Sequence, residues 1–195
     1  MAMSALKRIT VTALALLAFQ AAAPARAASL EVWSVSGWSQ FGSVDFEGPV
    51  QFSYIGLKKY CNMRMSLWIV NGSATVVSAS FTGGDCSSVV PQALPWSFYP
   101  LWPYPGSTPP ITGAPVMTPP LYSVNISGVR IALGPPLNVT CPSTTGTATM
   151  AAYLDHDSFG SFYNNRLVFD ATLGPCRFQT DFARELRASA PLRVI

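Results

Sequence analysis

The chain has little charge and almost no histidine. Asp, Glu, Lys and Arg together make up 11% of its 195 residues, and His156 is its one histidine. Proteins that bind nucleic acid or anionic membranes need clustered positive charge, so the scarcity of Lys and Arg argues against both partners. Past the N-terminal segment, no apolar run is long enough to form a membrane-spanning helix.

A convincing catalytic or metal-binding constellation is also missing. His156 lies between Asp155 and Asp157, with Ser158 adjacent. Catalytic triads are assembled from distant positions, however, and neighbouring side chains on a loop rarely point at one another. The four cysteines include no Cys-x-x-Cys pair of the kind that holds zinc. We therefore expect no enzymatic activity, no cofactor and no metal, and we interpret residues 155–158 as a solvated hairpin tip.

Residues 1–27 have the organisation of a secretory signal peptide. Lys7 and Arg8 precede an apolar segment of the usual length, and Ala25 and Ala27 supply the small side chains of a cleavage site. Residues 28–195 then contain nine basic and nine acidic residues, so the mature chain is neutral. We predict an exported protein that works in the periplasm, at the cell surface or outside the cell.

The mature chain is rich in Val, Thr, Ser, Gly and aromatic residues, which is a composition typical of strands and turns. Short segments of alternating polarity, separated by turn residues, favour a single all-β domain over residues 28–182. We predict an immunoglobulin-like β-sandwich of two analogous halves, each held by a disulfide. Residues 183–195 are expected to form a charged C-terminal tail.

The first half contains a hairpin whose register can be predicted from the positions of its apolar residues. Apolar residues alternate over residues 61–69 and again over 77–81, on either side of an Asn-Gly pair. A two-residue turn would put the two apolar sets on different faces. A three-residue loop ending in a bulged Gly72 brings them onto one face, with Met65 opposite Val77. We therefore predict the three-residue loop.

Four cysteines in an exported chain indicate two disulfides. Cys61 and Cys86 stand at the open end of the first hairpin, and Cys141 and Cys176 flank a similar hairpin in the second half. We predict the bonds Cys61–Cys86 and Cys141–Cys176, each contributing roughly 3–4 kcal/mol in the chain-entropy model.

Residues 91–120 combine ten prolines with five aromatic side chains. Because proline cannot donate a hydrogen bond to a sheet, this segment is not expected to run through a central strand from Pro100 onward, and we interpret it as a stiff, extended connection between the halves. Its aromatic side chains either cap the end of the core or form an exposed patch for hydrocarbon, lipid or a cell-surface protein. We expect Trp96 to be buried and Trp102 and Tyr104 to be at least partly exposed. The candidate binding residues are Trp96, Phe98, Tyr99, Trp102 and Tyr104.

Several short stretches over about residues 46 to 180 resemble exported bacterial proteins that activate alkane oxidation, the PraB type. They are "ASFTGGDC", followed by "LPW", then "NISGVRIALGPPLNVTC" and "ATLGPC". The matching positions are Ser80 to Cys86, Leu94 to Trp96, Gly128-Val129, Cys141 and Gly174 to Cys176. The resemblance brings no catalytic residues and implies an exported accessory protein that helps cells use or contact hydrocarbon. The alternative is a self-associating structural or adhesive subunit of a fibre or biofilm matrix, assembled through sheet edges.

Overall fold

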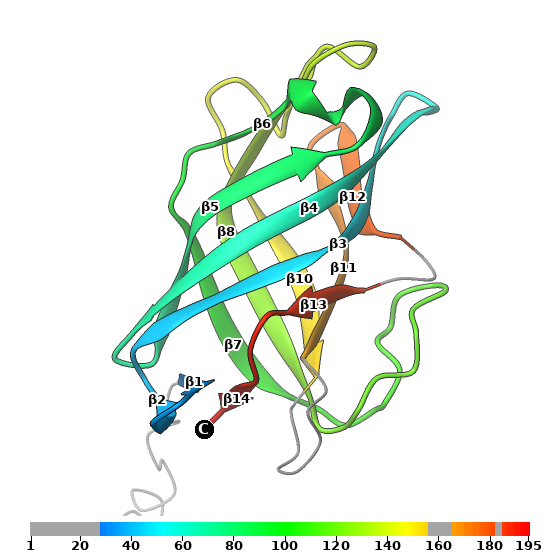
Figure 1. Cartoon of the computed structure of the whole chain (residues 1–195). Helices are drawn as coiled ribbons and strands as arrows, with labels where there is room; N and C mark the ends of the chain where they lie inside the picture. The colour runs from blue at the N-terminus through cyan, green and yellow to red at the C-terminus, as the bar shows by residue number, and fades with distance from the viewer. Residues whose placement is uncertain (1–27, 156–164, 182–184) are drawn as a thin grey trace, which may run out of the picture.

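A computed structural model describes residues 28–155, 165–181 and 185–195, which form a β-barrel (Figure 1). Eight antiparallel strands make up the closed wall. In order around the barrel they are β3 (Gly42–Tyr54), β4 (Leu57–Val70), β5 (Ser73–Thr82), β7 (Trp96–Tyr104), β8 (Leu121–Leu133), β10 (Ala148–Asp155), β11 (Arg166–Leu173) and β12 (Cys176–Thr180). The described residues contain no α-helix.

The all-β prediction is confirmed, but the strands do not form the two sheets of the predicted sandwich. Strands β8 and β10 pair from Leu121 opposite Asp155 to Val129 opposite Ala148, and this pairing closes the sheet on itself. An alternating strand must bury one face, and it can do so against a second sheet or inside a closed one. The alternation is the same in both cases, so it does not decide between them.

The β4–β5 hairpin differs from the prediction in its turn. Only Asn71 and Gly72 lie in the turn, both with positive φ (51° and 74°), as a type I′ turn requires. The predicted three-residue loop is therefore wrong. The apolar faces are brought into line by a β-bulge just beyond the pair of Leu67 with Val76, which leaves Val77 without a partner on β4 and turned outward.

Apolar side chains from alternate positions of every wall strand fill the barrel. Phe178 is at the centre of an aromatic group, with its ring centroid 4.3 Å from that of Phe52 and 4.7 Å from that of Phe169. Burying each such ring contributes roughly 1.5–3 kcal/mol. The interior is thus a packed core, so a partner would have to bind to the outer surface.

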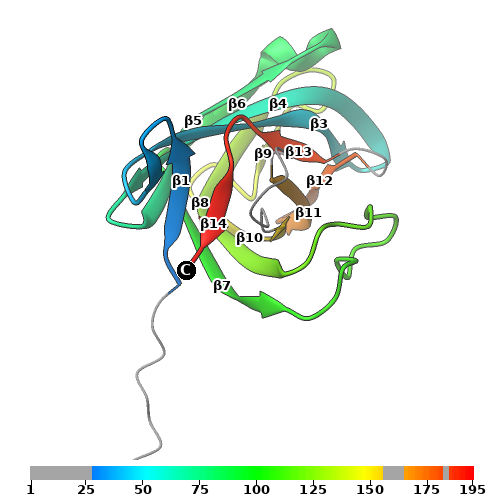
Figure 2. The same ribbon diagram turned by 60° about the horizontal axis from the view of Figure 1, so that its bottom comes forward.

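The lower end of the barrel is covered by a small sheet in the order β14 (Leu192–Val194), β1 (Leu30–Ser34), β2 (Gly37–Ser39). Figure 2, with this end forward, shows β1 and β14 side by side. Leu30 and Val32 of β1 and Leu192 of β14 are buried in the main core. Side chains at the alternate positions therefore face away from the barrel.

The predicted C-terminal tail is part of this fold. Strand β13 (Leu186–Ala188) pairs with β3 and β11, and β14 pairs with β1. Leu186 and Ala188 are buried, whereas Arg187 between them is exposed. The alternating pattern of β13 is only three residues long, so the charged residues of this segment obscure it in the sequence.

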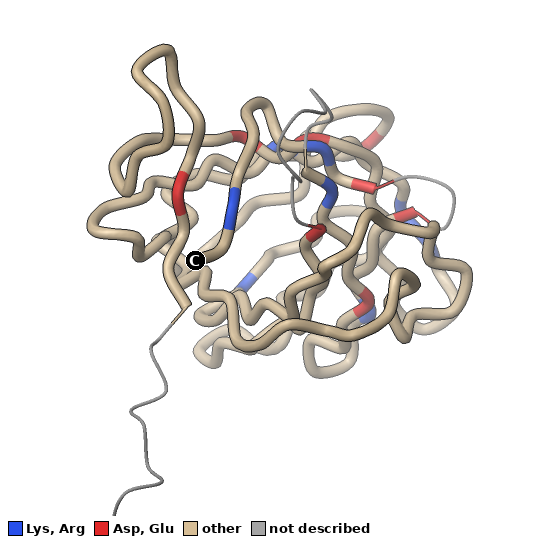
Figure 3. Tube along the Cα trace, turned by 90° about the horizontal axis from the view of Figure 1, so that it is seen from below, with Lys and Arg blue, Asp and Glu red and all other residues tan. Residues whose placement is uncertain are grey.

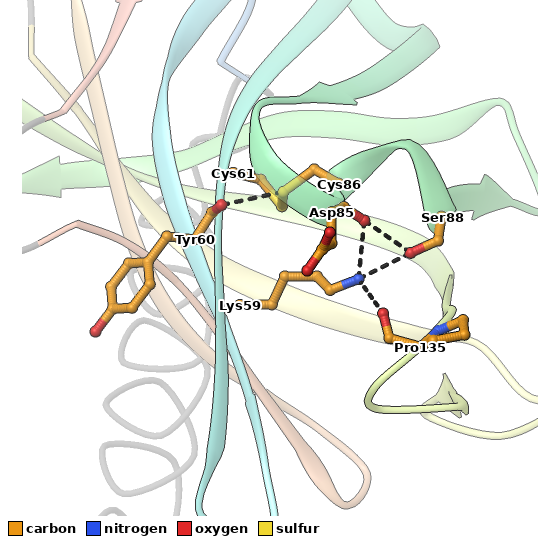
Figure 4. Close-up of a disulfide and its surroundings, with 7 residues drawn as sticks. All are labelled: Lys59, Tyr60, Cys61, Asp85, Cys86, Ser88 and Pro135. Carbon is orange, nitrogen blue, oxygen red and sulfur yellow. Dashed lines mark hydrogen bonds between the residues drawn. A yellow bond between two sulfur atoms is a disulfide. The ribbon is translucent and has the colours of Figure 1, made fainter.

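Both predicted disulfides are present. Cys61–Cys86 joins β4 to the short 3-10 helix η2 (Gly84–Ser88), as Figure 4 shows. Cys141–Cys176 joins β9 (Val139–Cys141), which pairs with β8, to the start of β12. A further short strand, β6 (Val89–Gln92), pairs with the same half of β8. The disulfides thus tie the segments at the upper end to the wall.

Lys59 lies beside the Cys61–Cys86 bond and is buried. Its Nζ donates to the carbonyl oxygen of Asp85 (3.0 Å), the hydroxyl of Ser88 (2.8 Å) and the carbonyl oxygen of Pro135 (2.7 Å), as Figure 4 shows. All three acceptors are uncharged oxygens. The ammonium group therefore joins η2 and the β8–β9 loop to β4, and all three of its donors are used.

Candidate functional site

The five candidate residues lie on β7, and the structure divides them between inside and outside. Trp96 and Phe98 are buried in the core. Tyr99 is 41% and Trp102 60% exposed, and Tyr104 is half-buried. The expectations for Trp96, Trp102 and Tyr104 are confirmed. The five do not form one surface, because alternation along a strand sends neighbours to opposite faces.

Trp96 is held by the wall strands on both sides. It pairs with Val76 of β5, and its Nε1 donates to the carbonyl oxygen of Gln92 at 2.9 Å. Gly128, with φ of 86°, interrupts β8 opposite this ring as a bulge. The indole is therefore a core side chain whose N–H is satisfied, and it is unavailable to a partner.

Pro100 lies inside β7 and is paired with Val124 of β8, so the strand continues past Pro100, but not as a central strand, as predicted. The pairing of β7 with β5 covers only Trp96 to Phe98. Beyond Phe98, β7 has one pairing neighbour in the part of the chain that the structure describes. A proline on such a strand removes a donor from an edge rather than from a central ladder, and the sheet tolerates it.

Trp102 and Tyr99 are the candidate residues that reach solvent. Trp102 lies where the β7–β8 register shifts, between the pairs made by Pro100 and Pro103. The hydroxyl of Tyr99 is 3.2 Å from that of Ser127 on β8. Hydrogen bonds with Ser127 and Asn125 lower the pKa of the Tyr99 phenol. Tyr99 is therefore oriented by polar contacts, whereas the indole of Trp102 is an exposed apolar surface.

Tyr104 belongs to a second apolar cluster on the outside of the barrel. Its ring meets that of Tyr153 edge-on at 5.3 Å between centroids, next to the buried Met117 and Val168. In the β7–β8 loop, residues 105–120, the Met117 N–H donates to the carbonyl oxygen of Ser107 at 2.8 Å and brings the two ends of the loop close together. The loop is thus compact and packed on the wall, where a stiff, extended connection was predicted.

A partly buried ion pair holds the same loop against the wall. The Oδ2 atom of Asp155 accepts a hydrogen bond from Arg166 Nε at 2.8 Å, and Arg166 Nη1 donates to the carbonyl oxygen of Val116 at 3.1 Å. Burial raises the pKa of Asp155, although hydrogen bonds and charge from Arg166 act in the opposite direction. The interpretation of Asp155 as part of a solvated tip is wrong, and residues 156–158 lie outside the described residues.

Sequence reasoning missed a group of exposed apolar residues at the lower end. They are Trp33, Val35, Phe41, Trp68 and Val70. A signal for one of them was available. Trp68 stands at an outward position of β4, in line with Asn62, Arg64 and Ser66. A large apolar residue in the polar phase of an alternating strand indicates an apolar side chain on the outer surface.

Among the residues that the structure describes, no helix is long and apolar enough to cross a membrane. Comparison with curated proteins and with solved structures found no significant match. Comparison with protein families matched residues 3–180 to the model described as alkane oxidation protein activator PraA/PraB-like. Because this match spans most of the 195 residues, the chain belongs to the alkane oxidation protein activator PraA/PraB-like family.

Proposed function

We propose that this protein is an exported, non-enzymatic accessory protein of alkane oxidation. It acts at the cell surface or outside the cell through apolar contact with hydrocarbon or with a surface partner. Membership of the alkane oxidation activator family is the observation that carries the proposal. The packed interior of the barrel supports it as well, because a ligand would have to meet the outer surface.

The exposed face of β7 offers the chemistry that such contact needs. Trp102 combines a large apolar ring with a single N–H donor, and Tyr99 combines one with a hydroxyl group. Side chains of this kind favour the boundary between water and an apolar phase, where the ring leaves water and the polar tip stays hydrated. Trp102, the more exposed of the two, is the first residue to change.

Growth on alkane tests the proposal. A strain lacking this gene should grow more slowly than its parent on a liquid alkane and equally well on a soluble carbon source. The wild-type gene should restore growth on alkane, and a Trp102→Ala gene should restore it only in part. Equal growth of deletion strain and parent on both carbon sources would contradict the proposed function.

A structural or adhesive subunit is the second candidate. The observation that favours it is the outer edge of β2, which has no strand partner among the described residues. Such an edge can pair with another chain by strand addition. Sedimentation of the purified protein over a range of concentrations tests this candidate. Oligomers or fibrils that form without hydrocarbon would favour it, and a monomer at all concentrations would exclude it.

A further inference from the structure

Exposed apolar side chains gather at the lower end of the barrel. Val35, at the β1–β2 turn, is fully exposed, and Phe41, between β2 and β3, is 59% exposed. Trp33, Trp68 and Val70 are also exposed. This set shares no residue with the β7 candidates.

Backbone contacts hold these residues at one place. The Leu30 N–H donates to the carbonyl oxygen of Gly72 at 2.8 Å, and the Gly72 N–H donates to that of Gln40 at 3.2 Å. The β4–β5 turn is thereby fixed against β1 and against the segment before β3. Phe41 immediately precedes β3 and Val70 is the last residue of β4, each one position beyond the last β3–β4 pair, Gly42 with Ile69.

The β1–β2 hairpin is held in shape before it meets any partner. The Ser34 hydroxyl donates to the carbonyl oxygen of Gly37 at 3.1 Å and accepts the Ser36 N–H at 3.3 Å. The rings of Trp33 and Trp38 meet edge-on, 5.4 Å apart. A hairpin tip that is already ordered loses little conformational entropy when it binds. The free energy gained by burying its apolar side chains is therefore not offset by a large cost of ordering.

Charge on this end favours an uncharged partner. The charged side chains of β1, β2 and β14 are Glu31 and Arg193, which pair at 2.5 Å. The Arg193 guanidinium also lies over the ring of Trp38, 4.5 Å from its centroid. Figure 3 views the molecule from this side, and most of the trace that faces the viewer carries no charge. An anionic surface would find no cluster of basic residues here, whereas an apolar phase meets a charge that is already compensated.

We propose that this end of the barrel adsorbs to the surface of liquid hydrocarbon. Val35 and Phe41 enter the apolar phase, and Trp33 stays at the boundary, where its N–H keeps contact with water. The inference rests on the proposed function and adds to it the surface that makes the contact. Removing one such side chain from water is worth about tenfold in binding or more.

Partitioning of the purified protein into hexadecane emulsions tests the inference. The variant Val35→Ser/Phe41→Ser should bind about 100-fold more weakly than wild type, from two side chains at about tenfold each. The matched control is Ile55→Ser/Leu57→Ser at the β3–β4 turn of the opposite end, where Ile55 is 79% exposed. This control should bind like wild type. Both variants should keep the wild-type unfolding temperature, because the replaced side chains are exposed.

The outcomes separate this inference from the function on which it rests. If wild type does not partition at all, both fail. If wild type partitions, Trp102→Ala weakens binding and Val35→Ser/Phe41→Ser does not, the inference fails and the proposed function stands. Equally tight binding to vesicles of zwitterionic lipid would identify a lipid surface as the partner and overturn it. So would a dimer of the wild type that the barrel-end variant no longer forms.

Discussion

The upper and lower ends of the barrel are closed by different interactions. At the upper end, two disulfides and the buried Lys59 link η2 and the β8–β9 loop to the wall. At the lower end, the sheet of β1, β2 and β14 is held by backbone pairing and by apolar contact with the core. Its outward face presents exposed apolar side chains. Disulfides and a buried cation thus hold the upper end, whereas backbone pairing and apolar packing hold the lower end.

The largest expected effect is on the upper end. The variant Cys61→Ala/Cys86→Ala should lower the free energy of unfolding by roughly 3–4 kcal/mol, because the open loop gains freedom in the unfolded chain. Urea unfolding measures this loss. Hydrocarbon binding per folded molecule should stay at the wild-type value. A loss of binding with unchanged stability would contradict the division between the two ends.

Lys59→Met should destabilise the protein by about 2 kcal/mol, because three oxygens lose the buried, charged donor that they share. Lys58→Met, one residue earlier and exposed, is the matched control and should change stability by about 0.5 kcal/mol at most. Thermal and urea unfolding of both variants measure the difference. Equal stability of the two would show that the Lys59 contacts do not hold the upper end together.

Trp102→Ala should cost about 1 kcal/mol or less, well below the roughly 3–5 kcal/mol of a core aromatic residue such as Trp96. It should weaken binding to an apolar surface, because the exposed indole is removed from the contact. Fluorescence quenching by a neutral quencher measures the exposure, and emulsion partitioning measures the binding. If the variant unfolds and binding per folded molecule is unchanged, Trp102 acts as a lid on the core.

The smallest effect is expected on the barrel wall, at Asp45 on β3. Hydrogen bonds with Ser66 and Arg64 lower the pKa of Asp45 below 3.8. Its contribution to stability is therefore complete above pH 3.8 and is lost as the pH falls through the lowered folded-state pKa. Asp45→Asn should remove this part of the acid dependence. Because solvent screens a surface ion pair, the change at neutral pH should be slight. Acid titration of unfolding for variant and wild type tests the sign.

Local patterns predicted the features that depend on neighbouring residues. Alternation identified the paired segments around Met65 and Leu167, and the positions of the cysteines at hairpin ends identified both disulfides. Prolines around Trp102 correctly indicated an exposed segment. These predictions succeeded because a strand, a turn and a short disulfide loop are each determined within a few tens of residues.

Other features depended on partners that are distant in the sequence. With a two-residue turn alone, the apolar side chains of β4 and β5 would lie on different faces of the hairpin. The bulge at Val77 returns them to one face, and no local sequence signal distinguishes this bulge from a longer loop. The burial of Asp155 also has no local sequence signal, because it follows from the packing of the loop that contains Val116 and Met117.

The sequence by itself determined the all-β class, the cysteine pairing, the burial of Trp96 and the neutrality of residues 28–195. Each of these follows from composition or from a short pattern. Only the tertiary structure decided that the sheet closes through β8 and β10, that the C-terminal residues cover the lower end, and that Trp33, Val35 and Phe41 are exposed. Alternation states that a strand buries one face, but the partner that buries it is chosen by the packing of the whole chain.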